Sequence, residues 1–138
     1  MPESKTKYKK VMVVDDTYVD RFIAEHNIRK YDFAEEVISK DTAQKALDYL
    51  MEMSDSPGAL PQIIFLDINL PGLDGFGFLD EFGKLPDEVK KNCVIILLST
   101  IIHPDHREQA KNNIYVSRLL GKPLDKEILD ELTAAKII

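Results

Sequence analysis

The sequence predicts an α/β protein with a doubly wound, five-stranded parallel sheet, and three observations support this prediction. The 138 residues, 44% of them hydrophobic, suit one domain with a real core. Short apolar runs alternate along the chain with helical patterns. These runs are apolar at every position, which is typical of parallel strands covered by helices on both faces. Because crossovers between such strands are right-handed, we expect the strand order 2-1-3-4-5.

The first half of the chain should contain two strands and two helices. Val19, Phe22 and Ile23 recur at helical spacing, which predicts the first helix. Asp41, followed by Gln44, resembles a capping box for the second helix, whose apolar stripe is the clearest in the sequence. The predicted elements are a strand at 11–14, a helix at about 18–30, an edge strand at 36–39 and a helix from Ala43 through Met51.

The second half continues the alternation of strand and helix. The continuous apolar runs at 63–66 and 94–98 predict two buried strands. Segment 86–92 is polar and is predicted to be a loop. The helix expected at about 104–112 has almost no apolar face, which predicts a marginal, mobile element. The remaining elements are a helix around Phe78, a strand at 115–120 and a final helix capped by Asp125.

Composition excludes several classes of protein. With 18 Lys and Arg against 24 Asp and Glu, the net charge is −6, which argues against nucleic acid as a partner. No apolar run approaches the roughly 20 residues that a membrane helix needs, and a single cysteine excludes a disulfide scaffold. We therefore expect a cytoplasmic protein with no membrane insertion. Residues 1–8 are expected to form a basic tail and residues 9–138 one domain.

Polar features follow four of the predicted strands: the pair Asp15 and Asp16, then Asp67, Ser99 and Lys122. The carboxyl ends of parallel strands lie along one edge of the sheet, where open α/β folds bind ligands. Strands one and three would be neighbours about 4.8 Å apart, so their three carboxylates would crowd together and resist joint ionisation. An all-oxygen set with room for water suits Mg²⁺. The sequence thus predicts a magnesium site with a lysine beside it.

Taken singly, each feature also has a structural interpretation. The aspartate pair, helped by Thr17, can cap the following helix, and Asp67 can be a turn residue. Ser99 can satisfy a backbone group at a strand end, and Lys122 can extend into solvent. Their occurrence at the ends of different strands, all on one edge, favours a functional site.

Four segments in order carry a family resemblance: Val-Val-Asp-Asp at 13–16, Asp-Ile-Asn-Leu-Pro-Gly-Leu-Asp-Gly at 67–75, Leu-Leu-Ser-Thr at 97–100 and Lys-Pro at 122–123. Together they resemble the receiver domain of bacterial two-component response regulators, which has a flavodoxin-like fold. The resemblance covers about residues 9–132. It implies that Asp67 is the phosphoacceptor and that the Lys122–Pro123 bond is cis.

The resemblance also implies a ligand set for each group at the site. Asp16 would bind Mg²⁺ directly, together with Asp67, while Asp15 would assist through water. The backbone carbonyl of Asn69 would be a further metal ligand. Ser99 and Lys122 would bind oxygens of the phosphoryl group, because a hydroxyl donor and an ammonium can counter the charge that these oxygens carry.

The residues expected to form the conformational switch depart from the family pattern. Receivers usually carry Tyr or Phe three positions before the lysine, but this chain has Leu119, which offers no ring or hydroxyl. Thr100 is larger than the usual small residue, and Ile101 cannot align a water molecule for hydrolysis. The resemblance implies a switch at Ser99, Thr100 and Leu119 that relies more on the loop after Ser99.

The expected function is that of a stand-alone receiver. Little chain follows the last helix, so we expect output through protein contacts or through passing the phosphoryl group on. The implied partners are a sensor histidine kinase and either a histidine phosphotransfer protein or a downstream target. We expect no enzyme activity beyond slow self-phosphorylation and self-dephosphorylation. Two alternatives stay open: a degenerate receiver that binds partners without phosphorylation, and an aspartate-nucleophile phosphatase, whose second acid would occupy the position of Asn69.

Overall fold

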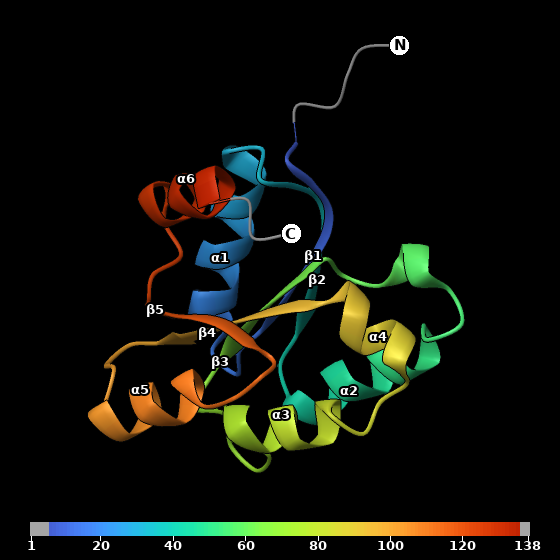
Figure 1. Cartoon of the computed structure of the whole chain (residues 1–138). Helices are drawn as coiled ribbons and strands as arrows, with labels where there is room; N and C mark the ends of the chain where they lie inside the picture. Colours follow the sequence, from blue (N-terminus) through green and yellow to red (C-terminus); the bar gives the residue numbers. More distant parts are fainter. Residues whose placement is uncertain (1–5, 136–138) are drawn as a thin grey trace.

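The structure, a computed structural model, describes residues 6–135 and has one parallel sheet at its centre (Figure 1). The strand order is β2-β1-β3-β4-β5, so the predicted topology is confirmed. Residues 1–5 of the predicted tail lie outside the described residues. The strands are β1 (Tyr8–Val14), β2 (Ala34–Lys40), β3 (Ile63–Asp67), β4 (Val94–Ser99) and β5 (Val116–Gly121).

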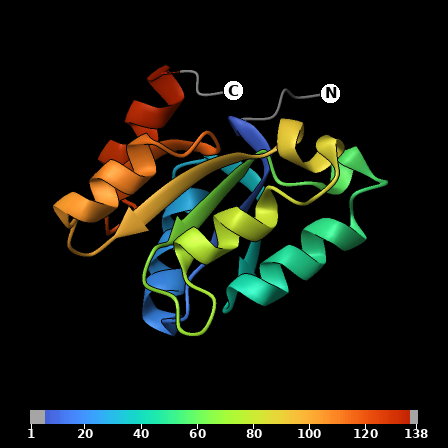
Figure 2. The same cartoon turned by 60° about the horizontal axis from the view of Figure 1, so that its bottom comes forward.

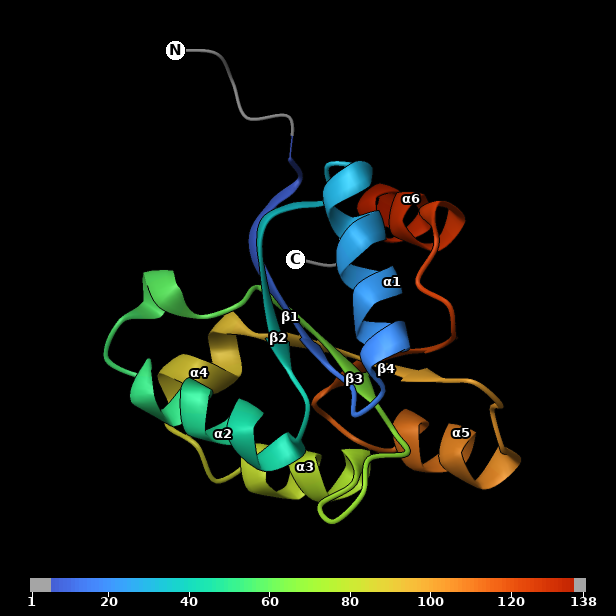
Figure 3. The same ribbon diagram turned by 180° about the vertical axis from the view of Figure 1, so that it is seen from behind.

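Helices cover both faces of the sheet. On one face α1 and α6 pack side by side, as Figure 3 shows, and Asn27 of α1 donates a hydrogen bond to the carbonyl of Leu124 at 2.9 Å. The other face is covered by α2, α3, α4 and α5, and Figure 2 shows α2 beside α3. The helices are α1 (Tyr18–Lys30), α2 (Ala43–Glu52), α3 (Gly75–Phe82), α4 (Asp87–Asn92), α5 (Pro104–Lys111) and α6 (Lys126–Ala135), with a short 3₁₀ helix at Pro57–Ala59.

The central strands are buried on both faces, which explains their continuous apolar runs. In β1, Met12 and Val14 join the core under α2 and α3, whereas Val11 and Val13 join the core under α1 and α6. The side chains of β3 and β4 divide between the two cores in the same way. Because successive side chains of a strand point to opposite faces, a strand between two helical layers needs an apolar residue at every position.

Two local predictions are wrong. Segment 86–92 is not wholly a loop, because α4 forms there and buries Val89 in the core under α2 and α3. The second helix begins at Ala43 as predicted, but its cap is Thr42 and not Asp41: the Thr42 side chain accepts a hydrogen bond from the Lys45 amide at 3.1 Å. Asp41 instead forms an exposed ion pair with Lys45. A single buried apolar residue stabilises α4, too weak a signal to separate it from a loop.

The apolar stripe of α1 forms a helix as predicted, yet it faces outward. Tyr18 is 69% exposed and Phe22 is 55% exposed, and their rings stack with centroids 6.3 Å apart. The residues of α1 that pack on the sheet are Ala24 and Ile28. An exposed aromatic surface therefore begins at Tyr18, two residues after Asp16.

Three smaller expectations are confirmed. The Lys122–Pro123 peptide bond is cis. Asp125 accepts a hydrogen bond from the Ile128 amide at 3.0 Å and so caps the start of α6. In α5 only Ala110 is buried, which agrees with the predicted lack of an apolar face, while the mobility of this helix stays a prediction. No helix in the described part of the chain is long and apolar enough to cross a membrane.

Candidate functional site

The ends of four strands bring the predicted polar residues to one edge of the sheet. Val14, the last residue of β1, pairs with Leu66 of β3, so Asp15 and Asp67 follow at the same level. At the other pair of strands, Ser99 lies opposite Gly121, and Lys122 comes next. The arrangement expected from a parallel sheet is thus present.

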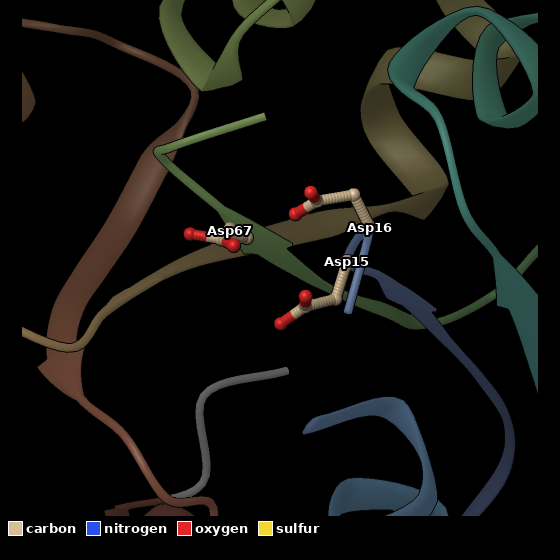
Figure 4. Close-up of side chains that lie close together, drawn as sticks. All are labelled: Asp15, Asp16 and Asp67. Carbon is tan, nitrogen blue, oxygen red and sulfur yellow. The ribbon is translucent and has the colours of Figure 1, made fainter. Parts of the chain in front are cut away.

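Three carboxyl groups gather at this edge, as Figure 4 shows. Asp15, Asp16 and Asp67 each place one oxygen so that all three oxygens lie within 4.8 Å of one another. Asp15 and Asp67 are buried, whereas Asp16 is exposed. Backbone amides fix the two buried groups: Thr17 donates to Asp15 at 2.9 Å and Asn69 donates to Asp67 at 3.0 Å. Hard carboxylate oxygens beside solvent are a donor set that fits Mg²⁺.

Lys122 is the cation of the site. Its side chain is only 11% exposed, so the interpretation as a solvated lysine is wrong. The ammonium nitrogen lies 2.5 Å from an Asp15 oxygen, 3.0 Å from an Asp67 oxygen and 3.1 Å from an Asp20 oxygen. Burial alone would lower the pKa of Lys122, but the hydrogen bonds to these carboxylates outweigh it and hold the pKa above its usual value.

The ionised form of Asp15 is disfavoured at this site. Burial raises the pKa of its carboxyl group, and the hydrogen bonds from Lys122 and Thr17 oppose this rise without cancelling it. The neighbouring charge of Asp67 adds to the rise. A second cation beside Asp15 would lower this pKa again, because it would stabilise the ionised form.

Asp20 is the site residue that sequence reasoning missed. It lies in the first turn of α1 rather than at the end of a strand, and its oxygen accepts a hydrogen bond from Lys122. The two residues are 102 positions apart in the sequence, so only the fold brings them together. The one available signal was an acidic residue on the helix that directly follows the aspartate pair.

Ser99 and Leu119 have partners other than the three carboxylates. Ser99 is fully buried, and its hydroxyl donates to the carbonyl of Ile101 at 2.6 Å. Leu119 is opposite Leu97 in the sheet and packs against the core under α2 and α3. Thr100 and Ile101 are exposed beside the site. In this arrangement the hydroxyl of Ser99 is already used as a donor to the loop that follows it.

Known proteins resemble this chain over nearly its whole length. A family model for the response regulator receiver domain matches residues 11–134. A two-component response regulator from Cytophaga hutchinsonii is 28% identical with a TM-score of 0.84, and the match covers 94% of this chain and 96% of that one. A response regulator receiver protein from Dyadobacter fermentans DSM 18053 is 29% identical with a TM-score of 0.82, over 92% and 96% of the two chains.

A relative with a named biological role is more distant. The probable methanogenesis regulatory protein FilR2 of Methanothrix harundinacea (strain 6Ac) is 25% identical over 119 residues, which are 86% of this chain and 75% of that protein. The match of the family model runs from the first buried strand into the last helix. The chain therefore belongs to the family of response regulator receiver domains, the phosphoacceptor modules of two-component signalling.

Proposed function

We propose that Asp67 accepts a phosphoryl group from a histidine of a sensor kinase, with Mg²⁺ bound beside it. The observation that carries the proposal is the position of the Asp67 carboxylate between two other carboxylates and the ammonium of Lys122. Such a group combines a nucleophilic oxygen with positions for two cations. Phosphoryl transfer depends on this combination, because the protein contributes mainly positioning and charge neutralisation.

Each residue has a distinct task in the proposed reaction. A carboxylate oxygen of Asp67 forms a bond to phosphorus as the bond from phosphorus to the donor nitrogen breaks. Asp16 and Asp67, with the carbonyl of Asn69, would hold Mg²⁺ and Asp15 would assist through water, so that the ion supplies positive charge to the phosphoryl oxygens. Lys122 already contacts Asp67 at 3.0 Å and would move its ammonium to a phosphoryl oxygen.

Ser99 would complete the binding of the phosphoryl group. Its hydroxyl has to leave the carbonyl of Ile101 before it can donate to a phosphoryl oxygen. The loop that follows Ser99 would move with it, and exposed Ile101 beside Ile102 then offers an apolar contact to a target protein. The signal is thus a change of loop position rather than a released product.

A protein donor fits the surroundings of the site. The stacked, exposed rings of Tyr18 and Phe22 lie at the start of α1, two residues after Asp16, and offer an apolar surface to a protein partner. We propose that this partner is the histidine-bearing domain of a kinase or of a phosphotransfer protein. Asp67 would hold the phosphoryl group for a time, and the group would then be lost slowly by hydrolysis or passed on to another protein. The chain would turn over no small-molecule substrate.

The test is phosphorylation by a small donor. The protein is incubated with acetyl phosphate and Mg²⁺, and its intact mass is followed over time. We expect one added phosphoryl group on the wild type and none on Asp67→Asn. Asp80→Asn, which changes an exposed aspartate of α3, is the matched control and should behave as wild type. A wild type that never gains mass would support the degenerate receiver, and continuous release of phosphate would support the phosphatase.

A further inference from the structure

Asp20 contacts Lys122 but stands apart from the group of carboxylates that could hold a metal. Within residues 6–135, that group consists of Asp15, Asp16 and Asp67. We propose that Asp20 is a positioning residue: it remains the counter-ion of Lys122 when Asp15 and Asp67 turn to Mg²⁺ and the phosphoryl group. The inference rests on the proposed function, because it concerns the metal and phosphoryl groups of that same site.

The hydrogen bonds of the ammonium show why such a residue is needed. A lysine ammonium has three donors, and here they face one oxygen each of Asp15, Asp67 and Asp20. Two of these three partners belong to the carboxylate group that would bind the metal. Metal binding therefore withdraws negative charge from Lys122 at the moment when it brings a second cation close to the ammonium.

Burial makes this withdrawal unfavourable. The Lys122 side chain is 11% exposed, so water cannot fully replace a lost carboxylate partner. A buried charge that loses its partner is strongly destabilising. Asp20 is 36% exposed and projects from α1, so it can pair with the ammonium without entering the metal site. Asp20 thus reduces the free energy that is lost when Asp15 and Asp67 turn from Lys122 to the metal.

The position of Asp20 does not depend on the side chain of Asp15. It lies within the first turn of α1, and the next residue, Arg21, donates from its side chain to the carbonyl of Asp15 at 2.8 Å. The helix start is thereby tied to the end of β1. A metal that draws the Asp15 side chain away would leave this backbone bond, and so the place of Asp20, intact.

Two simpler roles of Asp20 make different predictions. An acidic residue in the first turn favours a helix through the helix dipole, which would affect stability and not metal affinity. A carboxylate near the site also attracts Mg²⁺ directly, and that attraction does not require Lys122. Only the positioning role acts through the lysine.

A double-mutant cycle on Mg²⁺ binding separates these roles. Mg²⁺ is titrated by calorimetry into the wild type, Asp20→Asn, Lys122→Met and the double variant, with folding checked by circular dichroism. We expect Asp20→Asn to weaken Mg²⁺ binding about tenfold, as the loss of a residue that supports metal ligands does. In the Lys122→Met background the same change should have an effect below about twofold. Lys122→Gln is the second neutral background if Lys122→Met does not fold.

Glu25→Gln is the control, since Glu25 lies on the same helix and is partly exposed but does not pair with Lys122. It should leave Mg²⁺ affinity unchanged. An equal loss in both lysine backgrounds would show a direct charge effect and would overturn the inference. Unchanged affinity in Asp20→Asn would also overturn it while leaving the proposed function intact. A wild type that binds no Mg²⁺ would refute the metal site and this inference together.

Discussion

The hydroxyl of Ser99 donates a hydrogen bond to the carbonyl of Ile101, 2.6 Å away, so that it faces its own loop and not Asp67. Ser99 is fully buried, whereas Ile101 is 78% exposed. This bond joins the buried end of β4 to an exposed loop residue. A phosphoryl group on Asp67 would compete with the Ile101 carbonyl for the serine hydroxyl, and the loop conformation would depend on which acceptor prevails.

This competition predicts where phosphorylation changes the protein. We expect hydrogen exchange to change most in residues 99–113 and little at Leu119, because Leu119 packs in the core and has no hydroxyl or ring to reorient. Phosphorylated and beryllofluoride-bound protein should show the same pattern. A response confined to β5 and α6, with the loop after Ser99 unaffected, would place the switch elsewhere.

Mg²⁺ binding should depend more on Asp16 than on Asp15. Asp16 is exposed and available as a direct ligand, whereas Asp15 is already bound to Lys122 and the Thr17 amide. We expect Asp15→Ala to weaken binding roughly tenfold, as the loss of an outer partner does, and Asp16→Ala to weaken it further. Calorimetric titration of both variants measures this difference, with Asp80→Ala as the control. Equal losses would argue against separate roles.

Asp15 should also make stability depend on pH. Its pKa is raised by burial, so the folded protein holds this proton more tightly than the unfolded chain does. Protonated Asp15 therefore stabilises the fold at pH values below 3.8, the ordinary pKa of an aspartate. This stabilisation is lost as the pH rises through the higher pKa that Asp15 has in the folded protein. At neutral pH without Mg²⁺, ionised Asp15 lowers the free energy of unfolding.

Asp15→Asn removes this ionisation and keeps an oxygen for Lys122. We expect it to be more stable than the wild type towards urea at neutral pH, with the advantage shrinking in acid. Saturating Mg²⁺ should stabilise the wild type by about 2.7 kcal/mol at 100 times its dissociation constant. If the free energy of unfolding depended on pH in the same way in the wild type and in Asp15→Asn, ionised Asp15 would not lower stability and the prediction would be wrong.

Loss of the phosphoryl group should be slow because no polar side chain at position 101 aligns a water molecule. Ile101→Glu would place a carboxylate there and should shorten the lifetime of the phosphoryl group roughly tenfold, a small part of what a well-placed general base supplies. Ile114→Glu is the matched control, since Ile114 is 87% exposed and precedes β5 at the opposite edge of the sheet. An unchanged or longer lifetime in Ile101→Glu would contradict this account.

The sheet and most of the site follow from the sequence for one physical reason. Buried parallel strands need apolar residues at every position, so the points where the runs stop mark the edge of the sheet. Asp67 ends such a run, and the Asp15 and Asp16 pair follows another. Residues attached directly to strand ends could therefore be placed together before the structure was known.

Features that depend on helix orientation could not be predicted in this way. Helical spacing of Val19 and Phe22 predicted α1, but spacing does not say whether a stripe faces the sheet or solvent. The contact of Asp20 with Lys122 depends on that orientation as well. The partner of the Ser99 hydroxyl depends on the path of the following loop, and only the three-dimensional arrangement shows that it is the carbonyl of Ile101.

The most direct test of the central claim is to locate the phosphoryl group within the chain. Protein treated with acetyl phosphate and Mg²⁺ is reduced with borohydride, which converts an aspartyl phosphate to homoserine, and its peptides are sequenced by mass spectrometry. The account predicts conversion at Asp67 alone, abolished when Mg²⁺ is chelated. Conversion at Asp15, Asp16 or Asp20, or undiminished conversion without Mg²⁺, would contradict it.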